Sequence, residues 1–158
     1  MRLKFYKVRP EAKLPQRAHP VDAGLDLFYC SDPNFDSHCL WSPNDEFNIP
    51  PGENCLIPTG LKVETPGGYM LEVKNKSSIA SKRQLIVGAC IIDPEYTGEI
   101  YVNLHNIGRK SQIVTPGQKI AQIVLIPIAI CVVDEITYDP AIRGTSRGED
   151  GFGSTGEY

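Results

Sequence analysis

Residues 85–104 read LIVGACIIDPEYTGEIYVNL, and this stretch decides the fold class. An apolar run covers residues 85–92, and apolar side chains then alternate with others at positions 100, 102 and 104. Between the two parts, Asp-Pro at 93–94 and Thr-Gly at 97–98 are pairs that favour turns. The pattern predicts a strand, a turn and a second strand.

Similar short apolar or alternating segments recur along the rest of the chain. They lie around residues 3–8, 25–29, 55–57, 61–63, 69–73, 120–126 and 130–133. Many short strands separated by Pro-Gly and Thr-Gly turn signals predict an all-β domain, a jelly-roll-like barrel or sandwich. The one helix that we expect covers residues 77–83.

The size and charge of the chain limit its function. It has 158 residues, 41% of them hydrophobic and 22% charged, which suits one globular domain. The formal net charge of -3 argues against direct nucleic-acid binding, because domains that bind nucleic acid are usually basic. A small polyanionic ligand remains compatible, since it needs only a few local cations, backbone N–H groups or a metal ion.

Two regions break the strand pattern. Within an expected core domain of residues 1–142, residues 29–47 are polar and predict a loop insertion. This insertion is either a bare surface excursion or a docking site for another protein. Residues 143–158 contain five glycines and predict an arm without regular structure. Such an arm is either a flexible terminus or a segment that orders over a ligand, or both.

The cysteines and the apolar runs bear on localisation. The five cysteines are odd in number and form no CxxC pair, so we expect unpaired thiols, no structural zinc site and a reducing compartment. The first ten residues carry charges throughout, and the run at 120–133 is too short to span a membrane. We expect an intracellular protein, cytoplasmic or nuclear, with no membrane segment.

Two carboxylates are candidates for chemistry. Asp93 stands where an apolar strand ends, and a carboxylate there can orient a water or a hydroxyl, although an Asp that merely starts a turn is the commoner reading. Asp26 lies between Leu25 and Leu27, so a strand would point it to the opposite face. There it would hold a hydrated metal or simply face solvent.

Other polar residues are candidates for binding an anion. Lys76 precedes Ser77 and Ser78 at the expected start of the helix, which suits an anion site or a plain helix cap equally. Gln122 interrupts an apolar strand, and a buried amide needs partners.

The glycine-rich arm adds further candidates. Arg147 offers a fork that matches phosphate oxygens, and Ser154 and Thr155 offer hydroxyls. Phe152 has nothing local to pack on, which suits stacking on a planar ring, and glycines such as Gly153 let the backbone approach a ligand closely.

In order and identity these segments resemble the five motifs of the trimeric dUTP pyrophosphatase family. The matching stretches are residues 22–27, 76–80, 88–98, 117–122 and 147–156. The resemblance implies a jelly-roll-like subunit in a homotrimer, with three active sites at subunit interfaces and an arm that closes over the nucleotide. It also implies Mg²⁺-assisted hydrolysis of dUTP to dUMP and pyrophosphate, which limits uracil in DNA and supplies dUMP for dTMP synthesis.

The resemblance also implies roles for the residues of the core. Asp93 would position the attacking water and contact the 3′ hydroxyl, and Tyr96 would pack on the deoxyribose. The uracil edge would be bound by the backbone around Cys90, Ile91 and Ile92. The phosphate contacts would be Lys76, Ser77, Ser78 and Gln122. Asp26 would hold waters on the Mg²⁺ ion.

For the arm, the resemblance implies that Phe152 stacks on uracil in the Gly-rich backbone around Gly153. Arg147, Ser154 and Thr155 would hold the γ-phosphate.

The chain departs from the family pattern in four places. Lys76 stands where the family usually has Arg, and Ser78 and Cys90 stand where it often has Gly. Lys is a point charge that lacks the bidentate fork of Arg, so it would contact phosphate with a different geometry. A side chain at position 90 must point away from the base. Residues 29–47 are longer than a minimal member requires.

Two alternative functions follow from the same residues. A dCTP deaminase, alone or as a bifunctional enzyme, shares the fold but needs a glutamate that shuttles protons at the base, and Glu99 lies near the required strand. A regulatory protein that binds nucleotide as a signal would keep the fold without needing the catalytic residues.

Overall fold

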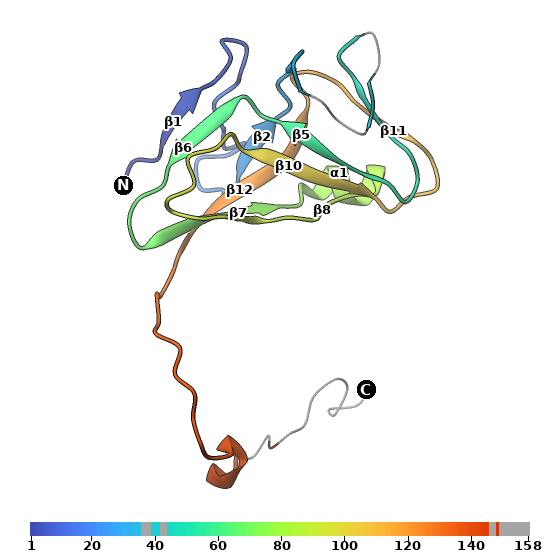
Figure 1. Cartoon of the computed structure of the whole chain (residues 1–158). Helices are drawn as coiled ribbons and strands as arrows, with labels where there is room; N and C mark the ends of the chain where they lie inside the picture. The colour runs from blue at the N-terminus through green and yellow to red at the C-terminus, as the bar shows by residue number, and fades with distance from the viewer. Residues whose placement is uncertain (36–38, 42–43, 146–147, 149–158) are drawn as a thin grey trace.

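A computed structural model describes residues 1–35, 39–41, 44–145 and 148, which form a mostly β fold (Figure 1). The strands are β1 (Lys4–Lys7), β2 (Leu25–Phe28), β3 (Leu40–Trp41), β4 (Phe47–Ile49), β5 (Asn54–Pro58), β6 (Leu61–Glu64), β7 (Tyr69–Lys74), β8 (Leu85–Val87), β9 (Ile91–Ile92), β10 (Tyr101–Asn106), β11 (Gln112–Val114) and β12 (Lys119–Pro127). The helical elements in the described part are α1 (Ser77–Arg83) and the 3-10 turn η1 (Pro140–Arg143). The expected all-β class is confirmed.

The strands pair into four antiparallel sheets. The largest has the order β2-β12-β7-β9, and the next have the orders β5-β10-β8, β11-β4-β3 and β1-β6. Their inner faces share one hydrophobic core, because alternate side chains of a strand point to opposite faces. In β10, Val102 and Leu104 are buried, whereas Tyr101, Asn103 and His105 are half-exposed.

The helix α1 lies where the sequence predicts it. Ile79 is its buried anchor, and Gln84 ends it with a left-handed backbone at φ 54°. Lys82 and Arg83 lie in its last turn, where positive charge suits the carbonyl end of a helix. Within the described ranges, neither helical element has the length and apolar character needed to cross a bilayer.

Several strand predictions need correction. The single strand expected over residues 85–92 is two strands, because residues 88–90 leave the ladder between β8 and β9. The short strands β3, β4 and β11 were not predicted, since two or three residues give too little periodicity to detect.

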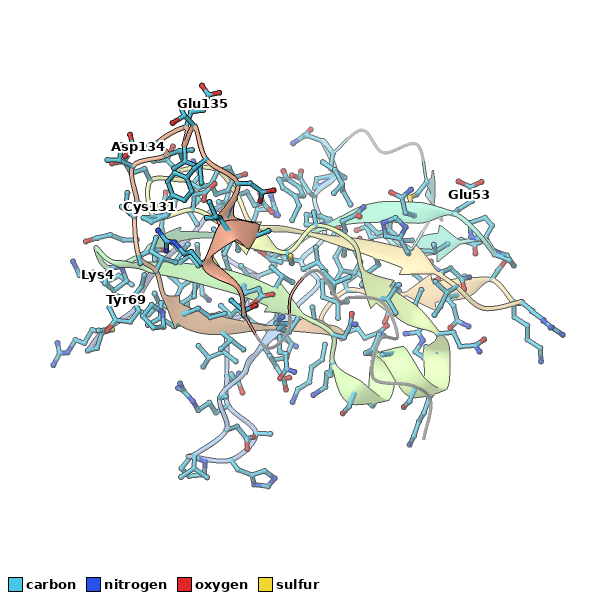
Figure 2. The ribbon with its side chains drawn as sticks, turned by 90° about the horizontal axis from the view of Figure 1, so that it is seen from below. Lys4, Glu53, Tyr69, Cys131, Asp134 and Glu135 are labelled. Carbon is cyan, nitrogen blue, oxygen red and sulfur yellow. A yellow bond between two sulfur atoms is a disulfide. The ribbon has the colours of Figure 1, made fainter. Side chains whose placement is uncertain are left out.

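The strand expected at residues 130–133 is wrong. The chain leaves the body of the protein after β12 and carries no strand there (Figure 1). Ile130, Val132 and Val133 are between 87% and 90% exposed, so these apolar side chains lack the packing that the sequence suggested. Cys131, Asp134 and Glu135 project from the same segment (Figure 2).

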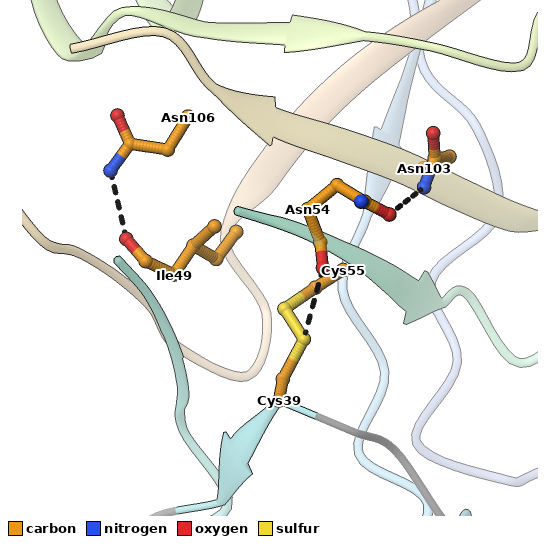
Figure 3. Close-up of a disulfide and its surroundings, with 6 residues drawn as sticks. All are labelled: Cys39, Ile49, Asn54, Cys55, Asn103 and Asn106. Carbon is orange, nitrogen blue, oxygen red and sulfur yellow. Dashed lines mark hydrogen bonds between the residues drawn. A yellow bond between two sulfur atoms is a disulfide. The ribbon is translucent and has the colours of Figure 1, made fainter. Parts of the chain in front are cut away.

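The expectation of five unpaired cysteines is also wrong. Cys39 and Cys55 form a disulfide with a Cα–Cα distance of 6.0 Å, which joins residues 29–47 to β5 (Figure 3). Cys30, Cys90 and Cys131 are free thiols, of which Cys30 is buried and Cys131 exposed.

Residues 29–47 are anchored at both ends. Tyr29 is buried at one end of this segment and packs edge-to-face on Phe47 at the other end, with 5.3 Å between ring centroids. The Tyr29 hydroxyl donates a hydrogen bond of 2.6 Å to the Asp45 carbonyl. Both ends of the segment are therefore held in the core.

Candidate active site

A pocket of about 330 Å³ opens beside β9 and the turn that follows it. It is lined by Leu56, Val73, Ala89, Ile91, Ile92, Asp93, Tyr96, Glu99, Ile100 and Tyr101. Four of the predicted site residues, Ile91, Ile92, Asp93 and Tyr96, therefore share one wall. The volume lies within the range of small-molecule sites.

The hairpin at residues 88–90 is clamped from both sides. The Gly88 N–H donates to the Asn103 carbonyl at 2.9 Å, and the Val73 N–H donates to the Cys90 carbonyl at 2.7 Å. A Cβ at Gly88 would lie 2.2 Å from Nε2 of His105, so a larger residue here would displace the His105 side chain. Because β10 and β7 both fix the backbone here, the wall of the pocket is preformed.

Cys90 lies in this hairpin, but Ala89 and Ile91 on either side of it line the pocket. This placement agrees with the requirement that a side chain at position 90 point away from the base. Cys90 is half-buried and unpaired.

The turn after β9 fixes the ring of Tyr96. The Tyr96 N–H donates to the Asp93 carbonyl at 3.1 Å, and the Tyr96 hydroxyl donates to the Glu99 carbonyl at 2.8 Å. A Cβ at Gly98 would lie 2.3 Å from that hydroxyl oxygen, so the ring lies against glycine. The Asp93 side chain is exposed and lines the same pocket, where it can reach a water or a ligand.

A second group of predicted residues surrounds Asp26 on β2. Asp26 is 4% exposed, and its carboxylate oxygens lie 2.8 Å from Nζ of Lys76 and 2.7 Å from Nζ of Lys119. Burial favours the neutral carboxyl, but the hydrogen bonds and charges of Lys119 and Lys76 outweigh it, so the pKa of Asp26 lies below its usual value. The interpretation of Asp26 as a solvent-facing residue is therefore wrong.

The other predicted phosphate contacts lie next to this carboxylate. Gln122 is the register partner of Asp26, and its Nε2 donates to the Asn75 carbonyl at 3.0 Å. Ser77 and Ser78 are exposed at the start of α1, directly after Lys76. The N-cap position is Lys76 and carries no side-chain capping bond, so the plain-cap interpretation of the serines gains no support.

These residues could contact a magnesium ion only through its bound waters. The described residues contain no group of three or more His, Cys, Asp or Glu side chains that could hold a metal. Both oxygens of Asp26 already contact lysines. Mg²⁺ keeps several waters and often uses substrate phosphates as ligands, so one carboxylate acting through water is compatible with an ion that arrives with a nucleotide.

Asp26 and Ile92 lie far apart on the sheet within one chain. Asp26 lies on β2 and Ile92 on β9, at opposite edges of the sheet β2-β12-β7-β9. Three strand spacings separate these edges, roughly 14 Å along the sheet. Arg147, Phe152, Gly153, Ser154 and Thr155 lie outside the described residues.

Sequence reasoning missed Leu56, Tyr101 and Lys119. The alternation in 101–106 assigns Tyr101 to the half-exposed face, but only the pairing of β5 with β10 places Leu56 near it. Lys119 reaches Asp26 through the pairing of β12 with β2. Contacts that depend on strand register have no signal in a single sequence.

The structure also places Glu99, the candidate proton shuttle of a deaminase. Its carboxylate is 8% exposed, pairs with both terminal nitrogens of Arg9 and accepts the Gly60 N–H at 2.7 Å. These hydrogen bonds give the Glu99 carboxylate a structural role. The strand that follows it, β10, carries no Asp or Glu. The deaminase interpretation therefore gains no support from this strand.

Comparison with known proteins identifies the family of the chain. The family model described as dUTPase matches residues 10–156. Deoxyuridine 5'-triphosphate nucleotidohydrolase of Gloeothece citriformis is 38% identical over 99% of this chain and 97% of its own. The protein of the same name from Chlamydia trachomatis serovar L2 is 41% identical over 97% of both chains.

Solved structures show the same fold. A variant of the Staphylococcus bacteriophage 80alpha dUTPase with dUpNHpp has a TM-score of 0.79 at 23% identity, over 98% of each chain. The dUTPase of S. aureus phage phi11, described with a structural Mg(II) ion, has a TM-score of 0.74 at 21% identity, over 87% of this chain and 98% of its own. With the family model spanning nearly the whole sequence, the chain belongs to the dUTPase family.

Proposed function

We propose that the protein hydrolyses dUTP to dUMP and pyrophosphate by in-line attack of water on the α-phosphate. The observation that carries this proposal is the pocket in which Ile91, Ile92, Asp93 and Tyr96 share one wall. Relatives named deoxyuridine 5'-triphosphate nucleotidohydrolase, 38% and 41% identical, support the same substrate.

The hairpin is assigned to the uracil base. Its backbone around Cys90, Ile91 and Ile92 would present a fixed pattern of donors and acceptors, so cytosine would leave buried polar groups unpaired. A tight hairpin would also leave no room for the methyl group of thymine.

The turn is assigned to the sugar and to catalysis. Tyr96, held by the Glu99 carbonyl, would pack on the deoxyribose where a ribose 2′ hydroxyl would clash. Asp93 would accept a hydrogen bond from the attacking water and contact the 3′ hydroxyl, which its exposed position at the pocket allows.

The edge around Asp26 is assigned to the phosphates. Lys76, Ser77, Ser78 and Gln122 would contact them, with Lys76 exchanging its bond to Asp26 for a phosphate oxygen. Bound Mg²⁺ would offset the charge of the phosphates, and Asp26 would hold its waters.

The arm is assigned to closure of the site. Phe152 would stack on uracil, with Gly153 bringing the backbone close to the ligand. Arg147, Ser154 and Thr155 would hold the γ-phosphate through charge-assisted hydrogen bonds.

A homotrimer with shared sites would follow the resemblance to the trimeric dUTP pyrophosphatase family. Asp26 and Ile92 lie at opposite edges of one sheet, which is compatible with a nucleotide bound between the pocket of one subunit and the charged edge of another. In the cell this activity would limit uracil in DNA and supply dUMP for dTMP synthesis.

Product analysis tests the proposal. Purified protein with Mg²⁺ should release pyrophosphate and dUMP from dUTP, release nothing from dCTP, and lose activity in EDTA. A uracil nucleotide formed from dCTP would show that the protein is a dCTP deaminase. A folded protein that turns over neither nucleotide would contradict hydrolysis and favour a nucleotide-binding regulator.

A further inference from the structure

We infer that residues 29–47 form a positioning element for the nucleotide pocket, acting through Phe35 and Asp32. This inference rests on the proposed function, since it assigns the segment a part in binding dUTP. Three separate connections run from the segment to residues that line the pocket.

The first connection is a ring stack. Phe35 lies on Tyr101 with 5.0 Å between ring centroids and 23° between planes. Tyr101 lines the pocket with Asp93 and Tyr96, and Phe35 is half-buried against the core. Stacked aromatic pairs stabilise each other beyond the area they bury, so Phe35 restrains the ring that forms this wall.

The second connection is a chain of ionic contacts. Oδ2 of Asp32 lies 2.8 Å from Arg9, and Arg9 also pairs with both oxygens of Glu99. The three side chains are only 8–17% exposed, which protects the pairs from solvent screening. The Glu99 carbonyl accepts the Tyr96 hydroxyl, so Asp32 is linked through two residues to the ring assigned to the sugar.

The third connection is covalent. Cys39 is bonded to Cys55 (Figure 3). The next residue along β5, Leu56, lines the pocket. Alternation along β5 explains the arrangement, because Cys55 is 1% exposed on the inner face while Leu56 is 41% exposed on the outer face. The disulfide therefore fixes the segment to the strand that carries this wall residue.

The connections reach Leu56, Tyr101 and, through Glu99, Tyr96, which are separate parts of one pocket. A segment with a purely structural task would stabilise the fold without any particular relation to the ligand. A segment that positions these side chains should instead change how tightly and how selectively the enzyme binds dUTP.

The test is a double-mutant cycle in the full chain, with Phe35→Leu, Tyr101→Leu and both together. In the single variant Phe35→Leu, KM for dUTP should rise about two- to tenfold while kcat changes little, because the stack restrains a wall of the binding pocket. In the Tyr101→Leu background, the further effect of Phe35→Leu on KM should vanish, since the partner is absent.

A second variant covers the ionic connection. Asp32→Asn should lower the ratio of kcat/KM for dUTP to that for UTP, since loosening of Tyr96 weakens exclusion of the ribose. Asn34→Ala is the matched control, because it changes an exposed polar side chain of the same segment. Circular dichroism and chromatography verify that every variant keeps its fold and assembly.

The outcomes distinguish failure of the positioning role from failure of the proposed function. An active wild-type enzyme whose KM and selectivity are unchanged in Phe35→Leu and Asp32→Asn would overturn the positioning role alone. So would an effect of Phe35→Leu that persists undiminished without Tyr101. A wild-type enzyme that does not hydrolyse dUTP would overturn the proposed function and this inference with it.

Discussion

The pocket beside β9 and the charged edge around Asp26 are built in opposite ways. The pocket is shaped by backbone and packing, with the hairpin clamped between β7 and β10 and the Tyr96 ring held against Gly98. At the charged edge, Asp26 is closed by Lys76 and Lys119, so the polar groups satisfy one another.

This difference bears on how each region would meet a ligand. A preformed pocket loses little conformational entropy on binding, so it suits recognition of the base and sugar. A charged edge that is paired internally has to exchange partners before it can bind phosphate. We therefore expect changes in the pocket to act on binding, selectivity and catalysis, and changes at the edge to act on stability as well as affinity.

The largest expected effect belongs to Asp93. Asp93→Asn should lower kcat by roughly 10² or more while nucleotide binding and folding persist, because an amide cannot accept the proton of the attacking water. Steady-state turnover of dUTP and binding of a non-hydrolysable analogue measure the two parts. Glu95→Gln is the control, since Glu95 is an exposed acid of the same turn that does not line this pocket. Near-normal turnover of Asp93→Asn would remove Asp93 from the mechanism.

The arm should have the next largest effect. A chain that ends before Gly151 should keep its fold and assembly but lose most activity, because it lacks Phe152, Ser154 and Thr155. Chromatography measures assembly, and pyrophosphate release measures activity. A truncated chain with full activity would contradict the assignment of the arm.

The two lysines of the charged edge should differ from each other. Both contact Asp26, so Lys76→Gln and Lys119→Gln should each lower Tm by a few degrees. Only Lys76→Gln should also raise KM for dUTP, roughly tenfold, because Lys76 adjoins Ser77 and Ser78 and would give a charge-assisted bond to phosphate. Equal KM changes in both variants would show that binding depends on Asp26 rather than on Lys76.

The smallest expected effect on activity concerns the disulfide, which acts mainly on stability. Reduction of Cys39–Cys55, whose partners are 16 residues apart, should lower the free energy of unfolding by about 3 kcal/mol through release of a closed loop. Denaturant titration with and without a reductant measures this. The control variant Cys131→Ser changes an exposed free thiol, so it should show the same loss of unfolding free energy on reduction. A wild-type unfolding curve that is the same with and without reductant would contradict the disulfide.

The sequence predicts the parts of the fold that carry strong local patterns. β7, β10 and β12 alternate or stay apolar for six residues or more, and α1 has its expected bounds. The apolar run at 130–133 misleads, because a strand also needs a ladder partner for its backbone groups, and the described part of this chain provides none there.

The candidate site likewise contains contacts that the sequence can predict and contacts that it cannot. Asp93 and Tyr96 are three residues apart, so one turn brings them to the pocket and the sequence can predict their proximity. The hydrogen bond between Lys76 and Asp26 joins residues 50 positions apart. The stack of Phe35 on Tyr101 joins the segment 29–47 to β10. Such contacts depend on strand register and on folding of residues 29–47, which local sequence does not encode.

The central claim is that one active site combines regions from different subunits, and complementation tests it most directly. Asp93→Asn and the chain that ends before Gly151 should be refolded together from denaturant, and the activity of the mixture compared with the sum of the separate activities. If the pocket and the arm of a site come from different chains, random mixing restores about a quarter of the sites and activity rises well above that sum. Activity equal to the sum, in mixed assemblies verified with two affinity tags, would mean that the pocket and the arm of each site belong to one chain and would contradict a site that these two regions share between subunits.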